Sequence, residues 1–241
     1  MRRVLAASFR LMAEAIAEVY RHRITLLRGT LLPFAGILLV DVFAGAANTA
    51  WGRLAWSFAV FPLYALLATT VHRVILLGEH SLPSPSGVYW SERETRFTGW
   101  LIGIWLLYFA LSLPTAFIAA AFDQSRDEYD LSWIGVILSF LLIAYFQGRF
   151  SLVLPATAVD RRMDFRESWA RSRGSGMIIA MALVIPAMIM IPVGEILYNT
   201  DRGDLALVAD VIYVLVLVPV YVVEIAIISL AWSSLESTGG R

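Results

Sequence analysis

The chain alternates long apolar segments with short polar ones. The apolar segments occupy six stretches, residues 29–48, 55–77, 100–122, 132–155, 174–198 and 205–232. Each is close to the length of about 20 residues that a helix needs to cross roughly 30 Å of hydrocarbon. The segments lack the in–out alternation of membrane barrel strands, and a helix in hydrocarbon satisfies its backbone hydrogen bonds within itself. The pattern therefore predicts an all-α protein, a polytopic membrane bundle of six transmembrane helices arranged as three hairpins.

Residues 1–28 follow a different pattern, in which apolar side chains recur at spacings of three and four. One face carries Leu5, Phe9, Met12, Ile16 and Val19, and the other carries Arg3, Arg10, Glu14 and Arg21. This pattern predicts a cytoplasmic amphipathic helix that lies along the membrane interface. The chain then divides into this interfacial helix, 1–28, and a six-helix transmembrane domain, 29–241. A cleaved signal peptide is not expected, because Arg10, Glu14 and Glu18 interrupt any apolar core.

Composition agrees with the membrane class. Hydrophobic residues make up 59% of the chain and charged residues 16%, against about 25% charged residues in soluble domains. The sequence has no cysteine, so it offers no disulfide and no thiolate metal site. Most prolines fall within or at the edges of the predicted spans, where a helical bundle tolerates them as kinks. They are Pro33, Pro62, Pro114, Pro155, Pro186, Pro192 and Pro219.

The arginines indicate an orientation. With the N-terminus inside, fourteen of the nineteen basic residues, all of them arginine, lie in inner segments. The outer loops hold only Arg53, Arg126 and Arg202, and they are rich in acidic residues such as Asp123 and Asp130. Because basic residues accumulate in cytoplasmic loops, the pattern predicts that both termini are cytoplasmic.

A threefold repeat is visible along the chain. Two segments, 88–97 and 164–171, mix aromatic residues with arginine and glutamate and precede the third and fifth spans. Arg73 and Arg149 lie at like depth in the second and fourth spans, each followed by an aliphatic run. We interpret this as three units, each a cytoplasmic amphipathic helix followed by an outward and a returning span. Basic inner loops alone would produce part of the same likeness.

Two stretches carry a resemblance to a known group, RFSLVLPATAVDRRMDFRESWARSRG at 149–174 and VHRVILLGE at 71–79. They are similar to segments of uncharacterised six-span bacterial inner-membrane proteins resembling the membrane domain fused to some glycerophosphodiester phosphodiesterases. The shared pattern is an arginine in a returning helix, a Pro-Ala step and an aromatic-rich block before a glycine. The resemblance implies a membrane scaffold in the bacterial inner membrane. It carries over no catalytic residue, because the chain lacks the soluble phosphodiesterase domain.

Two arginines lie inside predicted spans, where a charged side chain is costly. Arg149 lies about one helical turn from the inner interface, as does Arg73. One interpretation is snorkelling, in which the aliphatic stem stays in hydrocarbon and the guanidinium reaches headgroups or water. The sharper interpretation is that both arginines face inward and hold one anionic group, a lipid phosphate or a carboxylate. Glu224 is the candidate carboxylate partner, so Arg73, Arg149 and Glu224 form a candidate anion-binding, lipid-binding or structural network.

A second candidate polar site lies in the first span. Asp41 is near the middle of that span, and Asn48 follows two turns later on the same face. An ionisable group at membrane depth is costly and is by default a functional hypothesis, here a proton or cation relay. A neutral, packed aspartic acid is the alternative. His72 is interpreted as a helix-packing residue, and with three histidines in the chain no metal site is expected.

The sequence lacks recognisable enzyme motifs: it has no H-E-x-x-H, no G-x-S-x-G and no Walker loop. We therefore expect a non-enzymatic membrane protein, a scaffold or accessory subunit that binds lipid or a membrane partner complex. The alternative is a small-solute or lipid transporter that uses Asp41 and Glu224, since proline-interrupted spans are typical of midplane sites. Membrane lipids and other membrane proteins are the expected partners. Cofactors and nucleic acids are not expected.

Overall fold

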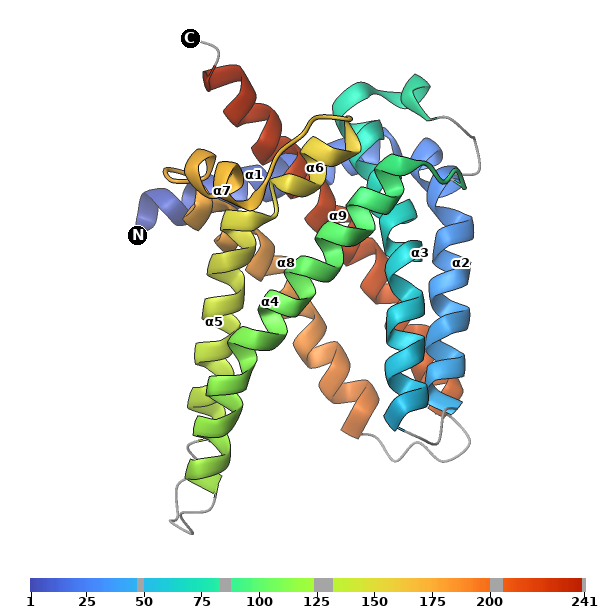
Figure 1. The fold of residues 1–241 in the computed structure, drawn as a ribbon, viewed down its shortest axis with the longest axis vertical. Coiled ribbons are helices and arrows are strands. Elements are labelled where there is room, and N and C mark those ends of the chain that lie inside the picture. Colours follow the sequence, from blue (N-terminus) through green and yellow to red (C-terminus); the bar gives the residue numbers. More distant parts are fainter. Residues whose placement is uncertain (47–49, 83–87, 124–131, 200–205, 240–241) are drawn as a thin grey trace.

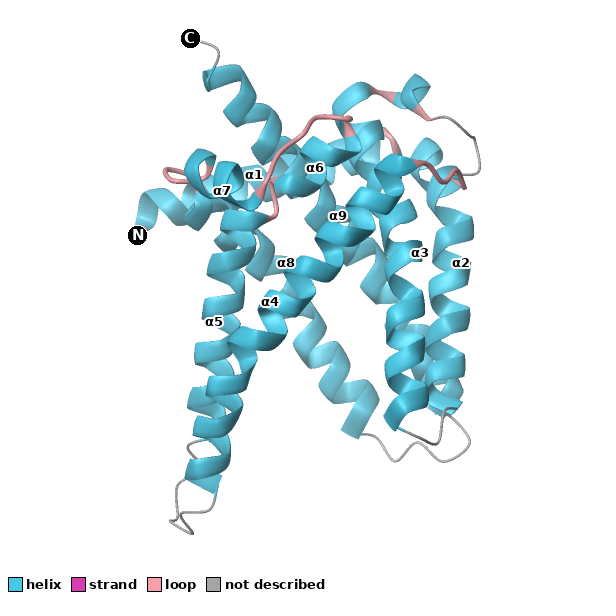
Figure 2. Ribbon diagram, in the orientation of Figure 1, coloured by secondary structure: helices cyan, strands magenta, loops and turns pink. Residues whose placement is uncertain are grey.

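The computed structural model describes residues 1–46, 50–82, 88–123, 132–199 and 206–239. These residues form helices joined by loops, with no strand among them (Figure 2). The elements in chain order are α1 (Arg2–Arg21), α2 (Arg23–Ala46), α3 (Ala50–Leu77), the short 3-10 helix η1 (Glu79–Ser81), α4 (Glu92–Asp123), α5 (Ser132–Phe150), α6 (Val153–Ala158), α7 (Phe165–Arg171), α8 (Gly176–Asn199) and α9 (Ala206–Gly239).

Six of the helices are long and apolar enough to cross a membrane. The apolar stretches are Arg23–Val40, Phe58–Leu77, Glu92–Pro114, Ile137–Ala158, Gly176–Gly194 and Val211–Ser237. Each predicted span therefore corresponds to a long helix. The predicted all-α polytopic bundle is confirmed, and the architecture is that of a multi-pass membrane protein.

Successive long helices pair as hairpins, α2 with α3, α4 with α5, and α8 with α9. The helix α4 begins beside α3 and crosses the bundle to reach α5 (Figure 1). The helix α9 packs against α1, α2, α3, α6 and α8 and is the central element. Small buried residues, Ala65 and Ala68 on α3 and Ala226 on α9, let these helices approach closely.

The helix α1 and the short elements η1, α6 and α7 gather at one end of the bundle (Figure 1), which we call the capped end. There α1 packs across α8 and α9, and Ser8 Oγ lies 2.9 Å from the carbonyl oxygen of Ile178 on α8. Ser8 and Ala15 are buried, whereas Phe9 and Ile16 are 52% and 48% exposed. Met12 and Val19 of the predicted apolar face pack against the core, so that face is divided between contact with the bundle and the outer surface.

Two boundaries differ from those expected. The helix α1 ends at Arg21 and α2 begins at Arg23, so residues 23–28 belong to the first long helix rather than to the interfacial one. The segment 88–97 was expected to hold a separate surface helix, but α4 runs unbroken from Glu92. A capping box explains its start: Glu94 accepts the backbone N–H of Ser91 (2.8 Å), and Ser91 Oγ accepts the N–H of Arg93 (3.2 Å).

The fourth span is broken near the capped end. Pro155 has no N–H to donate to the carbonyl of Ser151 four residues earlier, and that carbonyl accepts the N–H of Leu154 instead (3.0 Å). The break ends α5 at Phe150 and restarts the chain as α6 at Val153. It also leaves the Arg149 carbonyl free to accept the hydroxyl of Ser168 on α7 (2.7 Å).

Candidate functional site

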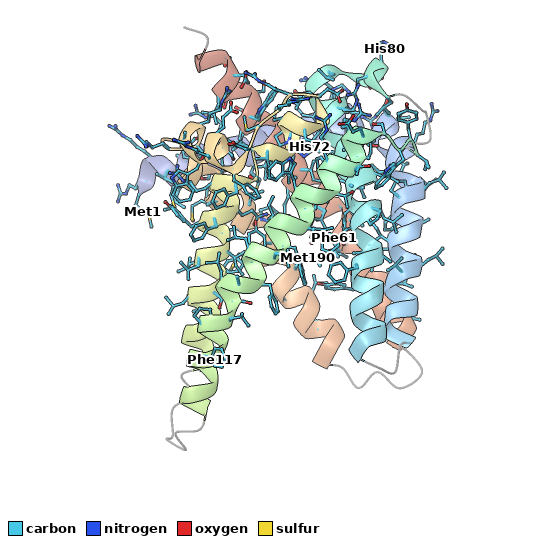
Figure 3. All side chains as sticks on the ribbon, viewed as in Figure 1. Met1, Phe61, His72, His80, Phe117 and Met190 are labelled. Carbon is cyan, nitrogen blue, oxygen red and sulfur yellow. The ribbon has the colours of Figure 1, made fainter. Side chains whose placement is uncertain are left out.

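A cavity of about 460 Å³ lies among the long helices α2, α3, α4, α5 and α9, with α6 at its edge. Its aromatic members are Phe61, Tyr64, Trp105, Tyr108 and Tyr221, and its other polar members are His72, Gln147, Ser151 and Glu224. Phe61 and His72 both lie on α3, with His72 nearer the capped end (Figure 3). At 1.5 Å per helical residue, their separation along α3 is roughly 16 Å.

His72 is fully buried between α3 and α9. Its Nδ1 lies 2.7 Å from Ser229 Oγ, and the Ser229 hydroxyl donates to the carbonyl of Ile225 (2.8 Å). Since a hydroxyl has one proton, the Ser229 oxygen then accepts a hydrogen bond from His72 Nδ1–H. In this tautomer the buried Nε2 carries a lone pair and is a hydrogen-bond acceptor.

Three buried polar atoms of the cavity lining have no hydrogen-bond partner in the part of the chain that the structure describes. They are His72 Nε2, Tyr108 Oη and Ser151 Oγ. Buried polar groups are nearly always hydrogen-bonded, and leaving one unsatisfied costs about 1–3 kcal/mol. Three residues that line the cavity therefore each hold a polar atom whose hydrogen-bonding capacity is unused.

Glu224 of α9 contributes the carboxylate of the cavity. Tyr221, three residues earlier on the same helix, and Tyr108 of α4 line the same cavity. Among the described residues Glu224 forms no ion pair with an arginine. The side chains of α9 reach the cavity at Val214, Leu217, Tyr221, Glu224, Ile225 and Ile228, which follow helical spacing. The carboxylate is therefore part of an apolar and aromatic wall, not of the charged capped end.

Arg73 belongs to the capped end. Its Nε and Nη2 donate to the carbonyl of Ser81 (3.1 and 2.9 Å), and its Nη1 donates to the carbonyl of Ala158 (3.0 Å). The same Nη1 lies 3.3 Å from Asp160 Oδ2, and Arg93 Nη1 lies 3.2 Å from the same oxygen. These contacts join α3, the turn after it, α4 and the end of α6. Arg73 thus has a structural role.

Asp160 is in an unusual backbone position. Its φ is 61°, a left-handed conformation that usually selects glycine. The N–H of Asp160 donates to the carbonyl of Thr157 (3.0 Å) and that of Arg161 to Ala156 (2.8 Å), the bonds of a Schellman motif that closes α6. An aspartate at this position places a carboxylate between Arg73 and Arg93.

Arg149 also has partners of its own. Its side chain is packed in the interior with the residue 7% exposed, and its Cζ lies 4.3 Å from the ring centroid of Trp169 and 6.0 Å from that of Tyr145. The chain passes Gly176 so closely that a Cβ there would lie 2.5 Å from Arg149 Cδ. The guanidinium is therefore held on an aromatic face, with a cation–π contact as its main interaction.

The three residues of the predicted network therefore have different surroundings. Arg73 contacts Asp160, Arg149 contacts Trp169, and Glu224 lines the cavity. Nothing in the described contacts joins the two arginines through one group, and whether they share a bound anion stays a prediction. Asp41 lies within α2 with its side chain outside the described part, and Asn48 lies outside the described residues altogether. Within the described ranges no three His, Asp or Glu side chains gather as a metal site.

Sequence reasoning missed most of the cavity. Tyr108, Gln147 and Ser151 were not singled out, and His72 was interpreted as a packing residue only. One signal was available: Gln147 and Ser151 are four residues apart, and Tyr221 and Glu224 are three apart, so each pair lies on one face of its helix. Polar pairs at helical spacing inside apolar spans indicate a shared polar surface within the bundle.

No protein-family model, curated protein or solved structure matches the chain. The resemblance to the membrane domain fused to some glycerophosphodiester phosphodiesterases therefore stays a prediction.

Proposed function

We propose that the protein is a non-enzymatic membrane protein that binds a small amphiphilic molecule in the cavity lined by His72, Tyr108 and Glu224. The observation that carries this proposal is a cavity of about 460 Å³ whose lining includes the carboxylate of Glu224 and three residues with unpartnered buried polar atoms. Pockets for small molecules commonly measure about 300–1,000 Å³ and combine an apolar lining with a few polar groups. Release of the molecule to either side of the membrane would make the same site that of a transporter.

Native mass spectrometry after gentle detergent extraction tests this proposal. The wild-type protein is expected to retain a small molecule, and Ala68→Phe, which fills the cavity from α3, is expected to lose it. Ala110→Phe is the matched control, because Ala110 is exposed on α4. Size-exclusion chromatography establishes that all three proteins are folded. Equal retention by wild type and Ala68→Phe would place the molecule elsewhere and contradict the proposal.

A specific observation favours a second function, that of a scaffold or accessory subunit that binds anionic lipid headgroups. A pocket of about 400 Å³ at the capped end is lined by Arg96, Arg161 and Arg162 together with Trp100. The Nε of Arg96 is buried without a hydrogen-bond partner, and Glu92 is 3.9 Å away. Arginine suits phosphate, and tryptophan favours the interface of a membrane. The same pocket is also lined by Glu92, Asp164 and Glu167. These carboxylates repel an anion, and for this reason we place this function second.

For localisation we propose the bacterial inner membrane, with the capped end and both termini in the cytoplasm. The support is the concentration of arginine in the segments that form this end, including Arg93, Arg161 and Arg171. A reporter fused at Arg241 is expected to be active in the cytoplasm, and one inserted at Asp127 on the outer side. The opposite result at either position would overturn this topology.

A further inference from the structure

We infer that the ligand of the intramembrane cavity is an organic cation, a protonated amine that carries an apolar group. This inference rests on the proposed function and names the chemical class of its ligand.

The charge of the cavity wall is the first argument. Among the described residues that line it, Glu224 is the one acidic residue and none is an arginine. Neither arginine of the second and fourth spans pairs with Glu224 in the described structure: Arg73 contacts two backbone carbonyls and Asp160, and Arg149 lies over the Trp169 ring. An isolated carboxylate in a low-dielectric site is costly unless it is paired or protonated. A bound cation would provide the counter-charge that the described chain does not supply.

The aromatic wall is the second argument. Tyr64 and Tyr221 lie with ring centroids 5.3 Å apart, and Phe61 and Trp105 lie 5.9 Å apart in an edge-to-face pair. With Tyr108 they give the cavity five aromatic rings from three helices. The faces of such rings attract ammonium groups. An anion would be repelled by the negative faces of these rings and by the carboxylate of Glu224.

The direction of the hydrogen bonds is the third argument. His72 Nδ1–H donates to Ser229 Oγ, because the Ser229 hydroxyl donates its own proton to the carbonyl of Ile225. His72 Nε2 is therefore unprotonated and can accept a hydrogen bond. Tyr108 Oη and Ser151 Oγ can also accept. A ligand that brings N–H donors can therefore satisfy these atoms as well as the charge of Glu224.

Three probes of matched shape and different charge test the inference: phenethylammonium, phenethyl alcohol and phenylpropionate. Binding to the purified full chain in detergent is measured by calorimetry, with empty micelles as the blank. The wild type is expected to bind the ammonium probe at least about tenfold more tightly than the alcohol, and not to bind the carboxylate. Glu224→Gln is expected to bind the ammonium and the alcohol with similar affinity. Glu92→Gln, at a carboxylate that is 85% exposed, is the control and is expected to behave as the wild type.

The outcomes separate the inference from the proposed function. Equal affinity of the wild type for the ammonium and the alcohol would overturn the cation inference and leave a binding cavity in place. Binding of none of the three probes by folded wild-type protein would overturn both. The comparison of probes on the wild type needs no variant, so it decides the question even where Glu224→Gln does not fold.

Discussion

Arg73 and Asp160 are 87 residues apart in the chain and form an ion pair of 3.3 Å at the capped end of the bundle. Asp160 reaches this position only because α6 closes in a Schellman motif with a left-handed residue, at φ 61°. Backbone strain of this kind costs about 1–3 kcal/mol at a residue other than glycine. The strain is compensated by a carboxylate that two arginines share, since Arg93 also contacts it at 3.2 Å.

Substitutions at Asp160 separate the charge from the backbone. Asparagine also tolerates the left-handed region, so the loss of stability in Asp160→Asn measures the contribution of the charge. We expect a loss of about 1 kcal/mol for this half-exposed pair. Asp160→Gly removes the charge and the strain together, whereas Asp160→Ala removes the charge and keeps the strain. We expect the alanine variant to be less stable than the glycine variant by about 1 kcal/mol. Unfolding in mixed micelles titrated with SDS measures these differences, and equal stabilities of the glycine and alanine variants would contradict the strained geometry.

Arg149 is expected to be coupled to Trp169. The contact of 4.3 Å between Arg149 Cζ and the Trp169 ring predicts a loss of about 1 kcal/mol in Arg149→Lys, because lysine lacks the flat guanidinium. In a double-mutant cycle, Arg149→Lys and Trp169→Leu should be non-additive, since each removes the same contact.

The matched control is the pair Arg149→Lys with Glu224→Gln. Glu224 lines the cavity and Arg149 does not, so their effects should add to within about 0.5 kcal/mol. Snorkelling predicts a different result, in which Arg149→Lys is silent and shows no coupling to Trp169. Strong coupling of Arg149 to Glu224 would instead support the shared network that the sequence suggested.

Gly148 lies at a close approach of α5 and α8. A Cβ at this position would collide with the carbonyl oxygen of Gly176 and lie 2.8 Å from the backbone nitrogen of Ala180. Backbone atoms cannot move aside as a flexible side chain can, so Gly148→Ala is expected to cost about 1–3 kcal/mol. Gly99→Ala is the control, because nothing lies within 4 Å of its Cβ position in α4. It should gain stability by about 0.5–1 kcal/mol from helix propensity. The same unfolding titration measures both, and a neutral Gly148→Ala would contradict the close packing.

Local features of this chain can be read from the sequence alone. The spans follow from hydropathy, because hydrocarbon accepts only long apolar helices. From the sequence we expected a separate helix over 88–97 and a kink at Pro155. The local signals for the start of α4, Ser91 and Glu94 spaced as a capping box, and for the break after α5, Pro155, were nevertheless present. Each of these depends on neighbours within a few residues.

The candidate site depends on contacts between distant residues and could not be predicted in this way. Arg149 is recognisable in the sequence as a charge inside an apolar span. Its partner Trp169 lies on α7, after the helix break, and the sequence does not show in which direction the chain turns there. His72 meets Ser229 across 157 residues, and the cavity combines side chains from several helices. A sequence pattern shows which face a residue occupies, but not which face of another helix lies opposite.

The junction between α1 and α2 is expected to respond to acid through Glu79. His22 Nδ1 lies 3.1 Å from Glu79 Oε1, and this hydrogen bond lowers the pKa of the Glu79 carboxyl below its ordinary value of 4.5. A group whose pKa is lower in the folded than in the unfolded protein stabilises the folded state at any pH above its unfolded-state pKa. This contribution is lost as the pH falls through its folded-state pKa. The stability difference between wild type and Glu79→Gln should therefore be constant near neutral pH and shrink in acid below 4.5. Glu92→Gln, which lacks such a contact to histidine in the described structure, serves as the control. Thermal unfolding in detergent across this pH range measures both differences, and a Glu79 difference that grows in acid would refute the assigned hydrogen bond.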